Sequence, residues 1–118
     1  MLTPFTLNFS IKKGQTFRKH LQFFEPDNVT PVNMTGWRAR MQGRPEPGSD
    51  TLLFDINTEN GGITLDPVTG DIQLYLSDEE VDTFDWDKCY HDFKFYYPNG
   101  DEDYLFEGTF TIRSRVTV

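Results

Sequence analysis

The sequence predicts an antiparallel β-sandwich of about eight short strands with one short helical turn. Apolar residues recur at every second position through most of the chain, which is the period of a strand with one buried face. Turn signals rich in Gly, Pro, Asn and Asp separate these runs. The 118 residues suit one domain spanning 1–118, and a barrel is the other architecture that this pattern allows.

Three strands are expected in the first 44 residues. The first has apolar residues at alternate positions: Phe5, Leu7, Phe9 and Ile11. The second covers residues 16–24, where Lys19 interrupts the apolar face as in an edge strand. The third covers residues 36–42 ("GWRARMQ"), in which Arg38 and Arg40 lie opposite the apolar side.

A loop and then a three-stranded meander are expected in the middle of the chain. Two prolines and two glycines indicate an exposed loop at residues 43–50. Three short alternating runs follow, at residues 52–56, 63–65 and 72–76. Asn60-Gly61 favours a hairpin between the first two runs, and Gly70 favours another between the last two.

The last third predicts a helical turn and a final hairpin. Ser77 and Glu80 fit a capping box, so one turn is expected at residues 77–83, crossing from one sheet to the other. The next strand has an apolar face formed by Cys89, His91, Phe93 and Phe95. An Asn-Gly turn at 99–100 leads to a partner strand with inward residues Tyr104, Phe106, Gly108, Phe110 and Ile112. Residues 114–118 could extend that strand or pair elsewhere.

The charge is unevenly distributed along the chain. The formal net charge of −8 argues against nucleic acid or anionic membranes as partners. Residues 1–44 hold seven bases and two acids, residues 45–112 hold two bases and seventeen acids, and Arg113 and Arg115 follow. The two segments either neutralise each other as neighbours within one fold, or provide a basic face that meets the acidic face of another molecule.

Catalytic and metal sites are not expected. One cysteine and two histidines make a poor zinc inventory, and Cys89 with His91 suits core packing better than a nucleophile and base. Acids at 82–87 and 101–103 could gather around calcium, but solvated acidic loops are expected because the EF-hand spacing is absent. The chain has neither a secretion signal nor an apolar run of membrane-spanning length, so we expect a soluble protein without cofactors.

The order of several motifs resembles a module of tailed-phage structural proteins. These motifs are "GQTF" at 14–17, "PVNMTG" at 31–36 and "GTFTI" at 108–112. Together they are similar to the N-terminal domain of the baseplate upper protein family, although Met34 stands where that pattern commonly has leucine. The resemblance implies an immunoglobulin-like β-sandwich that serves as a virion building block or adaptor.

The expected function is therefore that of a non-enzymatic phage virion protein. It would be made in the host cytoplasm and bind other virion structural proteins as a tail, baseplate or capsid-surface adaptor or decoration module, in several copies. Strand addition at the first strand or the last residues is one expected mode of contact. The expected interface residues are Phe5, Leu7, Phe9, Arg38, Arg40, Tyr75, Trp86, Tyr96, Tyr97, Arg113 and Arg115. The alternative is a saccharide-binding module that uses surface aromatics.

Overall fold

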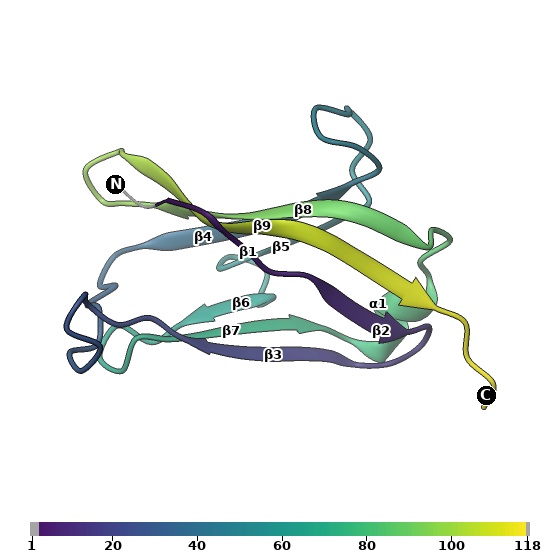
Figure 1. Cartoon of the computed structure of the whole chain (residues 1–118), viewed down its shortest axis with the longest axis horizontal. Helices are drawn as coiled ribbons and strands as arrows, with labels where there is room; N and C mark the ends of the chain where they lie inside the picture. Colours follow the sequence, from purple (N-terminus) through teal and green to yellow (C-terminus); the bar gives the residue numbers. More distant parts are fainter. Residues whose placement is uncertain (1–2, 118) are drawn as a thin grey trace.

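Two β-sheets face each other in the computed structural model, which describes residues 3–117 (Figure 1). Sheet A contains β1 (Phe5–Thr6), β2 (Phe9–Lys12), β4 (Arg38–Arg44), β5 (Phe54–Asn57), β8 (Lys88–Tyr96) and β9 (Glu102–Arg113). Sheet B contains β3 (Phe17–Gln22), β6 (Ile63–Leu65) and β7 (Asp71–Leu76). This arrangement confirms the predicted β-sandwich.

An aromatic core fills the space between the sheets. Burial alternates along β8, where Phe93 and Phe95 are fully buried, and β9 contributes Phe106 and Phe110. Phe93 stacks on Phe106 with ring centroids 5.2 Å apart. Burying each phenylalanine contributes on the order of 1.5–3 kcal/mol to the stability of the fold. The face of each strand that carries these residues therefore points inward.

The predicted first strand is two strands, and both run parallel to β9. The chain is irregular at Leu7 and Asn8, where the Asn8 side chain accepts a hydrogen bond from the Thr109 amide at 2.9 Å. Gly108 makes this approach possible, because a Cβ atom there would lie 2.3 Å from the Leu7 carbonyl oxygen. The sandwich is therefore antiparallel except along this edge of sheet A.

The predicted meander is wrong at its first turn. β5 pairs with β4 in sheet A, whereas β6 pairs with β7 in sheet B. The Asn60-Gly61 turn thus carries the chain from one sheet to the other and does not close a hairpin. Asn57 and Asn60 stabilise this path with side-chain oxygens that accept backbone N–H groups, which removes the need for strand pairing. The second hairpin, between β6 and β7, is confirmed.

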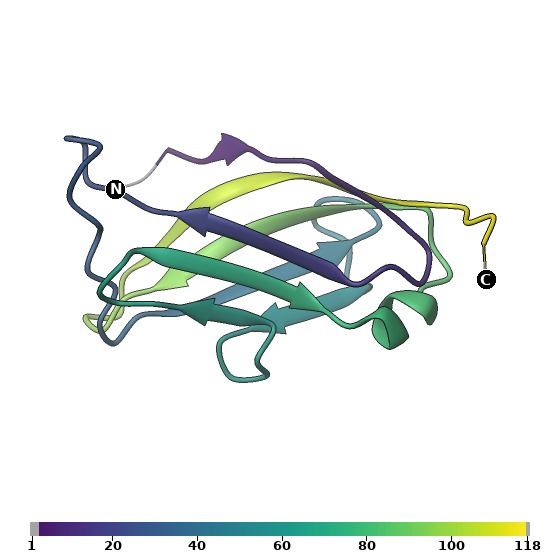
Figure 2. The ribbon, with the colours of Figure 1, turned by 90° about the horizontal axis from the view of Figure 1, so that it is seen from below.

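The helix α1 (Asp78–Asp82) connects β7 in sheet B to β8 in sheet A (Figure 2). The Ser77 hydroxyl accepts the N–H of Glu80 at 3.1 Å, as the capping box predicts. Val81 is buried and fastens the helix to the core. The predicted role of this turn as a crossing between sheets is confirmed.

A register shift in β9 overturns the prediction that Tyr104 points inward. The shift lies between Phe93 and Lys94 on β8, and it places Leu105 and Phe106 both in the core. Tyr104 is 41% exposed as a result. A bulge inserts one residue and reverses the alternation on one side of it, which periodicity alone does not reveal. Residues 114–117 are outside any strand, and Val118 lies outside the described residues.

Candidate functional site

A polar groove of about 860 Å³ lies on the outer face of sheet A. Its floor is formed by β4, β8 and β9, and the loop at 45–53 between β4 and β5 rises above the sheet (Figure 1). Pro47, Gly48, Ser49 and Asp50 of that loop line one side of the groove. The loop was predicted to be exposed, and it forms a wall because Arg44 donates to the Ser49 carbonyl at 3.1 Å.

Strand register places the groove residues in rows. Four rows cross β9, β8 and β4 in that order: Thr109–Tyr90–Arg44, Glu107–Asp92–Gln42, Tyr104–Lys94–Arg40 and Glu102–Tyr96–Arg38. Cations, carboxylates and tyrosines thus lie next to one another on one wet sheet face. This composition differs from the inner face of the same strands, which is almost entirely aromatic and aliphatic.

Positive side chains lie over the tyrosine rings of this face. The Lys94 ammonium nitrogen is 5.2 Å from the ring centroid of Tyr96 and 5.4 Å from that of Tyr104, and it also pairs with Glu102. The nitrogen of Lys88 is 5.5 Å from the ring centroid of Tyr90. These contacts hold the rings in place and occupy part of the π surface that a ligand could otherwise use.

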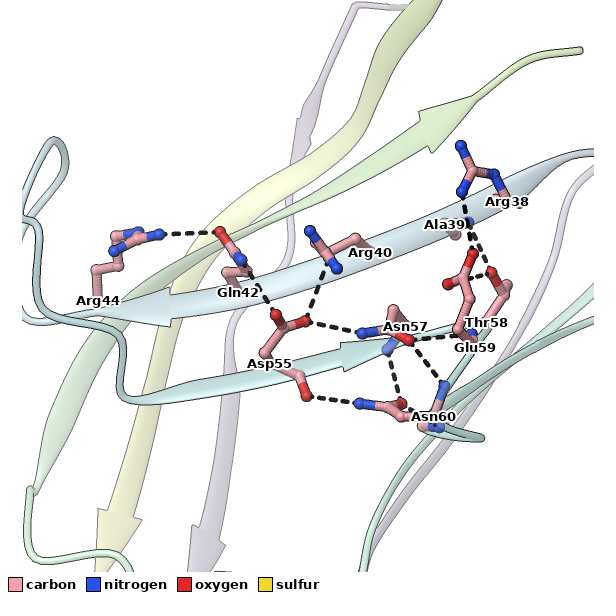
Figure 3. A network of polar contacts seen from close by, with 11 residues as sticks. Arg38, Ala39, Arg40, Gln42, Arg44, Asp55, Asn57, Thr58, Glu59 and Asn60 are labelled. Atoms are coloured by element: carbon pink, nitrogen blue, oxygen red, sulfur yellow. Dashed lines mark hydrogen bonds and ion pairs between the residues drawn. The ribbon is translucent and has the colours of Figure 1, made fainter.

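A polar network joins β4 to β5 at the margin of the groove (Figure 3). Arg40 Nε lies 3.5 Å from Asp55 Oδ1, and Arg38 Nη1 lies 3.3 Å from Glu59 Oε1. Both pairs join a base of residues 1–44 to an acid of residues 45–112. The interpretation that the two charge segments neutralise each other within one fold is therefore confirmed for these residues.

Two carboxylates in the groove have no such partner. Asp92 on β8 lies directly opposite Glu107 on β9, and both residues are exposed. Neither carboxylate makes a hydrogen bond or an ion pair with a residue in the described range 3–117. The pKa of Asp92 is raised, first by desolvation and then by the charge of Glu107, while Lys94 and Arg44 oppose the shift. The groove thus holds a like-charge pair on its floor.

Cys89 and His91 belong to the core and not to a catalytic pair. Burial raises the pKa of the Cys89 thiol to about 12, so the reactive thiolate is not formed at neutral pH. His91 Nε2 donates to the Leu7 carbonyl at 2.8 Å, and Nδ1 has no partner among residues 3–117. Desolvation lowers the pKa of His91 more than the Leu7 hydrogen bond raises it. The neutral imidazole therefore ties β8 to the N-terminal strands.

The predicted interface residues do not form one surface. Only Arg40 and Tyr96 line the groove, and Arg38 adjoins it. Phe9 is 7% exposed and belongs to the core. Phe5 is 47% exposed at the edge of sheet A.

The other predicted interface residues lie elsewhere. Tyr97 donates a hydrogen bond to Asp103 and packs on Trp37, and desolvation with that hydrogen bond raises its pKa to about 12. Tyr75 lies on sheet B beneath the Arg18 guanidinium. The remaining four are half-buried or exposed: Leu7 beside β9, Trp86 against Phe54 and Phe84, Arg113 at the end of β9, and Arg115 paired with Asp82.

The sequence interpretation missed most of the groove. The sequence pattern includes Asp92, Lys94 and Glu107 only in a charge total and predicts that Tyr104 lies on the inward face. Tyr90 was recognisable as an aromatic opposite the apolar face, but its neighbours could not be known. The missing information is the register across three strands, because residues 42, 92 and 107 are adjacent only after β4, β8 and β9 pair.

No cluster of three or more His, Cys, Asp or Glu residues within 3–117 is arranged to hold a metal ion. Over the same residues, no helix combines the length and apolar character required to cross a membrane. In comparisons with known proteins, the sequence matches neither a protein-family model nor a curated protein.

Proposed function

We propose that the chain is a non-enzymatic structural module of a phage virion that binds neighbouring virion proteins. The observation that carries the proposal is the outer face of sheet A, a hollowed surface that combines tyrosines with arginines. These residue types are enriched where protein interfaces concentrate their binding energy. The resemblance of three motifs to a baseplate module directs the choice of partner to other virion proteins.

The strand order supports the immunoglobulin-like part of this proposal. In sheet B, β3-β7-β6 has the order of strands B, E and D of an immunoglobulin sandwich. In sheet A, β9-β8-β4 has the order of strands G, F and C, and β5 takes the place of the extra strand of variable-type domains. Such sandwiches present loops and sheet faces from a rigid core, as an adaptor or decoration module requires.

Particle composition tests the proposal. Purified virions are analysed by mass spectrometry and by labelling with an antibody raised against residues 3–117. The proposal predicts that the chain is present in several copies at the tail, baseplate or capsid surface. Its absence from intact virions, together with its presence in infected-cell lysate, would contradict a structural role.

Saccharide binding is the second candidate, because Tyr90, Tyr96 and Tyr104 come together on the groove. Sugars stack on aromatic faces, however, and the ammonium groups of Lys88 and Lys94 already lie over these rings. The protein-binding proposal is therefore preferred. Glycan-array binding that is lost on Tyr96→Ala, with virion incorporation unchanged, would favour the saccharide instead.

A further inference from the structure

The edges of the two sheets differ in how they are protected against pairing with another chain. Over residues 3–117 the edges of sheet A are β5 and the pair β1–β2, and those of sheet B are β3 and β6. Native edge strands are commonly protected by short length or by charged side chains. β6 has three residues, β5 carries Asp55, and β3 carries Lys19 at an inward position opposite the buried Leu74. These three edges are therefore poor templates for an added strand.

The edge formed by β1 and β2 has no such protection. Residues 1–11 contain no charged side chain, and Phe5 is 47% exposed. β1 and β2 pair with β9 on one side, and within the described range no strand pairs with their other side. Figure 2 shows this purple segment at the margin of the sandwich. We refer to residues 4–12 as the N-terminal edge.

The backbone of the N-terminal edge has hydrogen-bonding groups that point away from the sheet. Leu7 and Lys13 each donate an N–H to a carbonyl of β9 at 2.9 Å. Because alternate residues of a strand direct their N–H and C=O groups to the same side, those of Thr6 and Ser10 point to the open side. The backbone groups of Lys12 are already bonded within the turn that follows β2. The open row therefore lies before Lys12.

The irregularity between β1 and β2 leaves this row open. The Leu7 carbonyl accepts a hydrogen bond from His91, and the Asn8 side chain accepts the N–H of Thr109. Both contacts are made toward β8 and β9. The break in β-structure is thus stabilised from within the sheet and does not cover the free edge.

We propose that the N-terminal edge pairs with the N-terminal edge of a second copy of this chain. The two edges run antiparallel about a two-fold axis at Asn8, so that Thr6 lies opposite Ser10 and Pro4 lies opposite Lys12 of the other copy. Sheet A then continues from one copy into the next through a self-complementary interface. This inference goes beyond the proposed function and does not depend on it.

Charge favours a second copy as the occupant. In this register no like charges lie opposite each other, and Lys12 faces Pro4, which has neither a charge nor an N–H to leave unpaired. On the outer face Thr6 is in register with the exposed Glu107 of β9. Lys12 of each copy therefore approaches Glu107 of the other, with one strand between them, and the two-fold axis makes this attraction twice.

Burial of apolar surface favours the same occupant. Phe5 and Ile11 of the other copy become neighbours, which covers the exposed ring of Phe5. Pairing two β3 edges would instead bring Arg18 and Lys19 of one copy close to the same bases of the other. The N-terminal edge is thus the better site for self-association.

The first test is the mass of the chain in solution. Analytical ultracentrifugation between about 5 μM and about 500 μM covers the range expected for a small interface. The inference predicts a change from the chain mass of 13.8 kDa to twice that mass as concentration rises. Over the same range, hydrogen exchange measured by NMR should slow at the amides of Thr6 and Ser10 and stay unchanged at residues 18–22 of β3.

Double variants test the register. Thr6→Lys with Ser10→Lys opposes two cations at two places and should weaken the dimer at least about tenfold. Thr6→Lys with Ser10→Glu opposes charges of unlike sign and should keep the affinity within about threefold. Thr51→Lys with Gln73→Lys adds two cations at exposed positions outside the N-terminal edge and should leave the affinity unchanged.

Several results would overturn the inference. They are a monomer at every concentration, equal affinities in the two edge variants, an equal loss in the control variant, or no protection at Thr6 and Ser10. Thermal unfolding of each variant checks the fold, which should be kept because both edge positions are exposed. A dimer formed by a chain absent from virions would contradict only the proposed function. A monomeric chain that is present in virions would contradict only this inference.

Discussion

The two faces of strand β8 follow different rules. Its inner residues Cys89, His91, Phe93 and Phe95 are at most 4% exposed and pack against aromatic rings of β2 and β9. Its outer residues are tyrosines and charged residues (Lys88, Tyr90, Asp92, Lys94 and Tyr96), and Asp92 lies opposite Glu107. Packing explains the inner face except at His91, whose Nε2 donates to the Leu7 carbonyl. The outer face forms a groove that combines tyrosines with charged side chains, which is the reason for proposing that this face binds a partner.

The largest expected loss of stability is for a substitution on the inner face of β8. Phe93→Ala should lower the free energy of unfolding by about 3–5 kcal/mol, because it leaves a cavity among fully buried rings. Tyr90→Ala on the outer face of the same strand should cost less than about 1 kcal/mol. Urea unfolding followed by tryptophan fluorescence measures both. Similar losses for the two variants would remove the distinction between the faces.

A smaller loss of stability is expected for a substitution where β9 pairs with β1 and β2. Gly108→Ala places a Cβ atom 2.3 Å from the Leu7 carbonyl oxygen and should cost about 2 kcal/mol, since the crowding atom belongs to the backbone. Hydrogen exchange should accelerate most at residues 5–12. Ser10→Ala, at an exposed position of β2, is the matched control and should change neither quantity. Uniform acceleration over both sheets would contradict a local role for Gly108.

The pH dependence of stability should contain a contribution from His91. Burial lowers the pKa of this residue in the folded chain, so the unfolded chain binds the proton more readily. Its contribution to stability is therefore present above the ordinary histidine value of about 6.5 and is lost as the pH falls below that value. Urea unfolding at several pH values should show a weaker acid loss in His91→Gln than in the wild type.

The exposed histidine provides the control for that experiment. His20 lies 3.2 Å from Asp71 on sheet B, away from the contact between His91 and Leu7. The His20→Gln variant should keep the acid loss attributed to His91. If His91→Gln retains the full acid loss, the buried imidazole is not its source.

The smallest expected change is a gain in stability. Asp92→Asn removes the repulsion with Glu107 and should raise the free energy of unfolding by about 0.5 kcal/mol at neutral pH. The pKa of Asp92 is raised in the folded chain, so its ionised form opposes folding and the gain should vanish when both carboxyls are protonated. Glu25→Gln, in an exposed loop, should be neutral. A loss of stability in Asp92→Asn would show that Asp92 serves the fold.

The sequence predicted those parts of the fold that depend on local pattern. Alternation identified the buried faces of β4 and β8, and Ser77 with Glu80 identified the start of α1. Which strands pair with each other was harder to predict from the sequence. Asn60-Gly61 favours a hairpin locally, but β5 pairs with β4, and Phe54 and Ile56 are buried in the core.

The candidate site was largely invisible for the same reason. Its floor is assembled from three strands, and a bulge that leaves no periodic signal turns Tyr104 outward. Arg40 and Tyr96 could be selected from the sequence because they lie opposite apolar positions. Asp92 and Glu107 could not be selected together, because they become neighbours only when β8 and β9 are in register.

A reconstruction of the assembled virion that contains this chain tests the central claim most directly. The account predicts that a neighbouring protein covers the outer face of sheet A and buries the exposed rings of Tyr90 and Tyr104. A reconstruction in which that groove is open to solvent, while the neighbours contact sheet B or the ends of the sandwich, would contradict it.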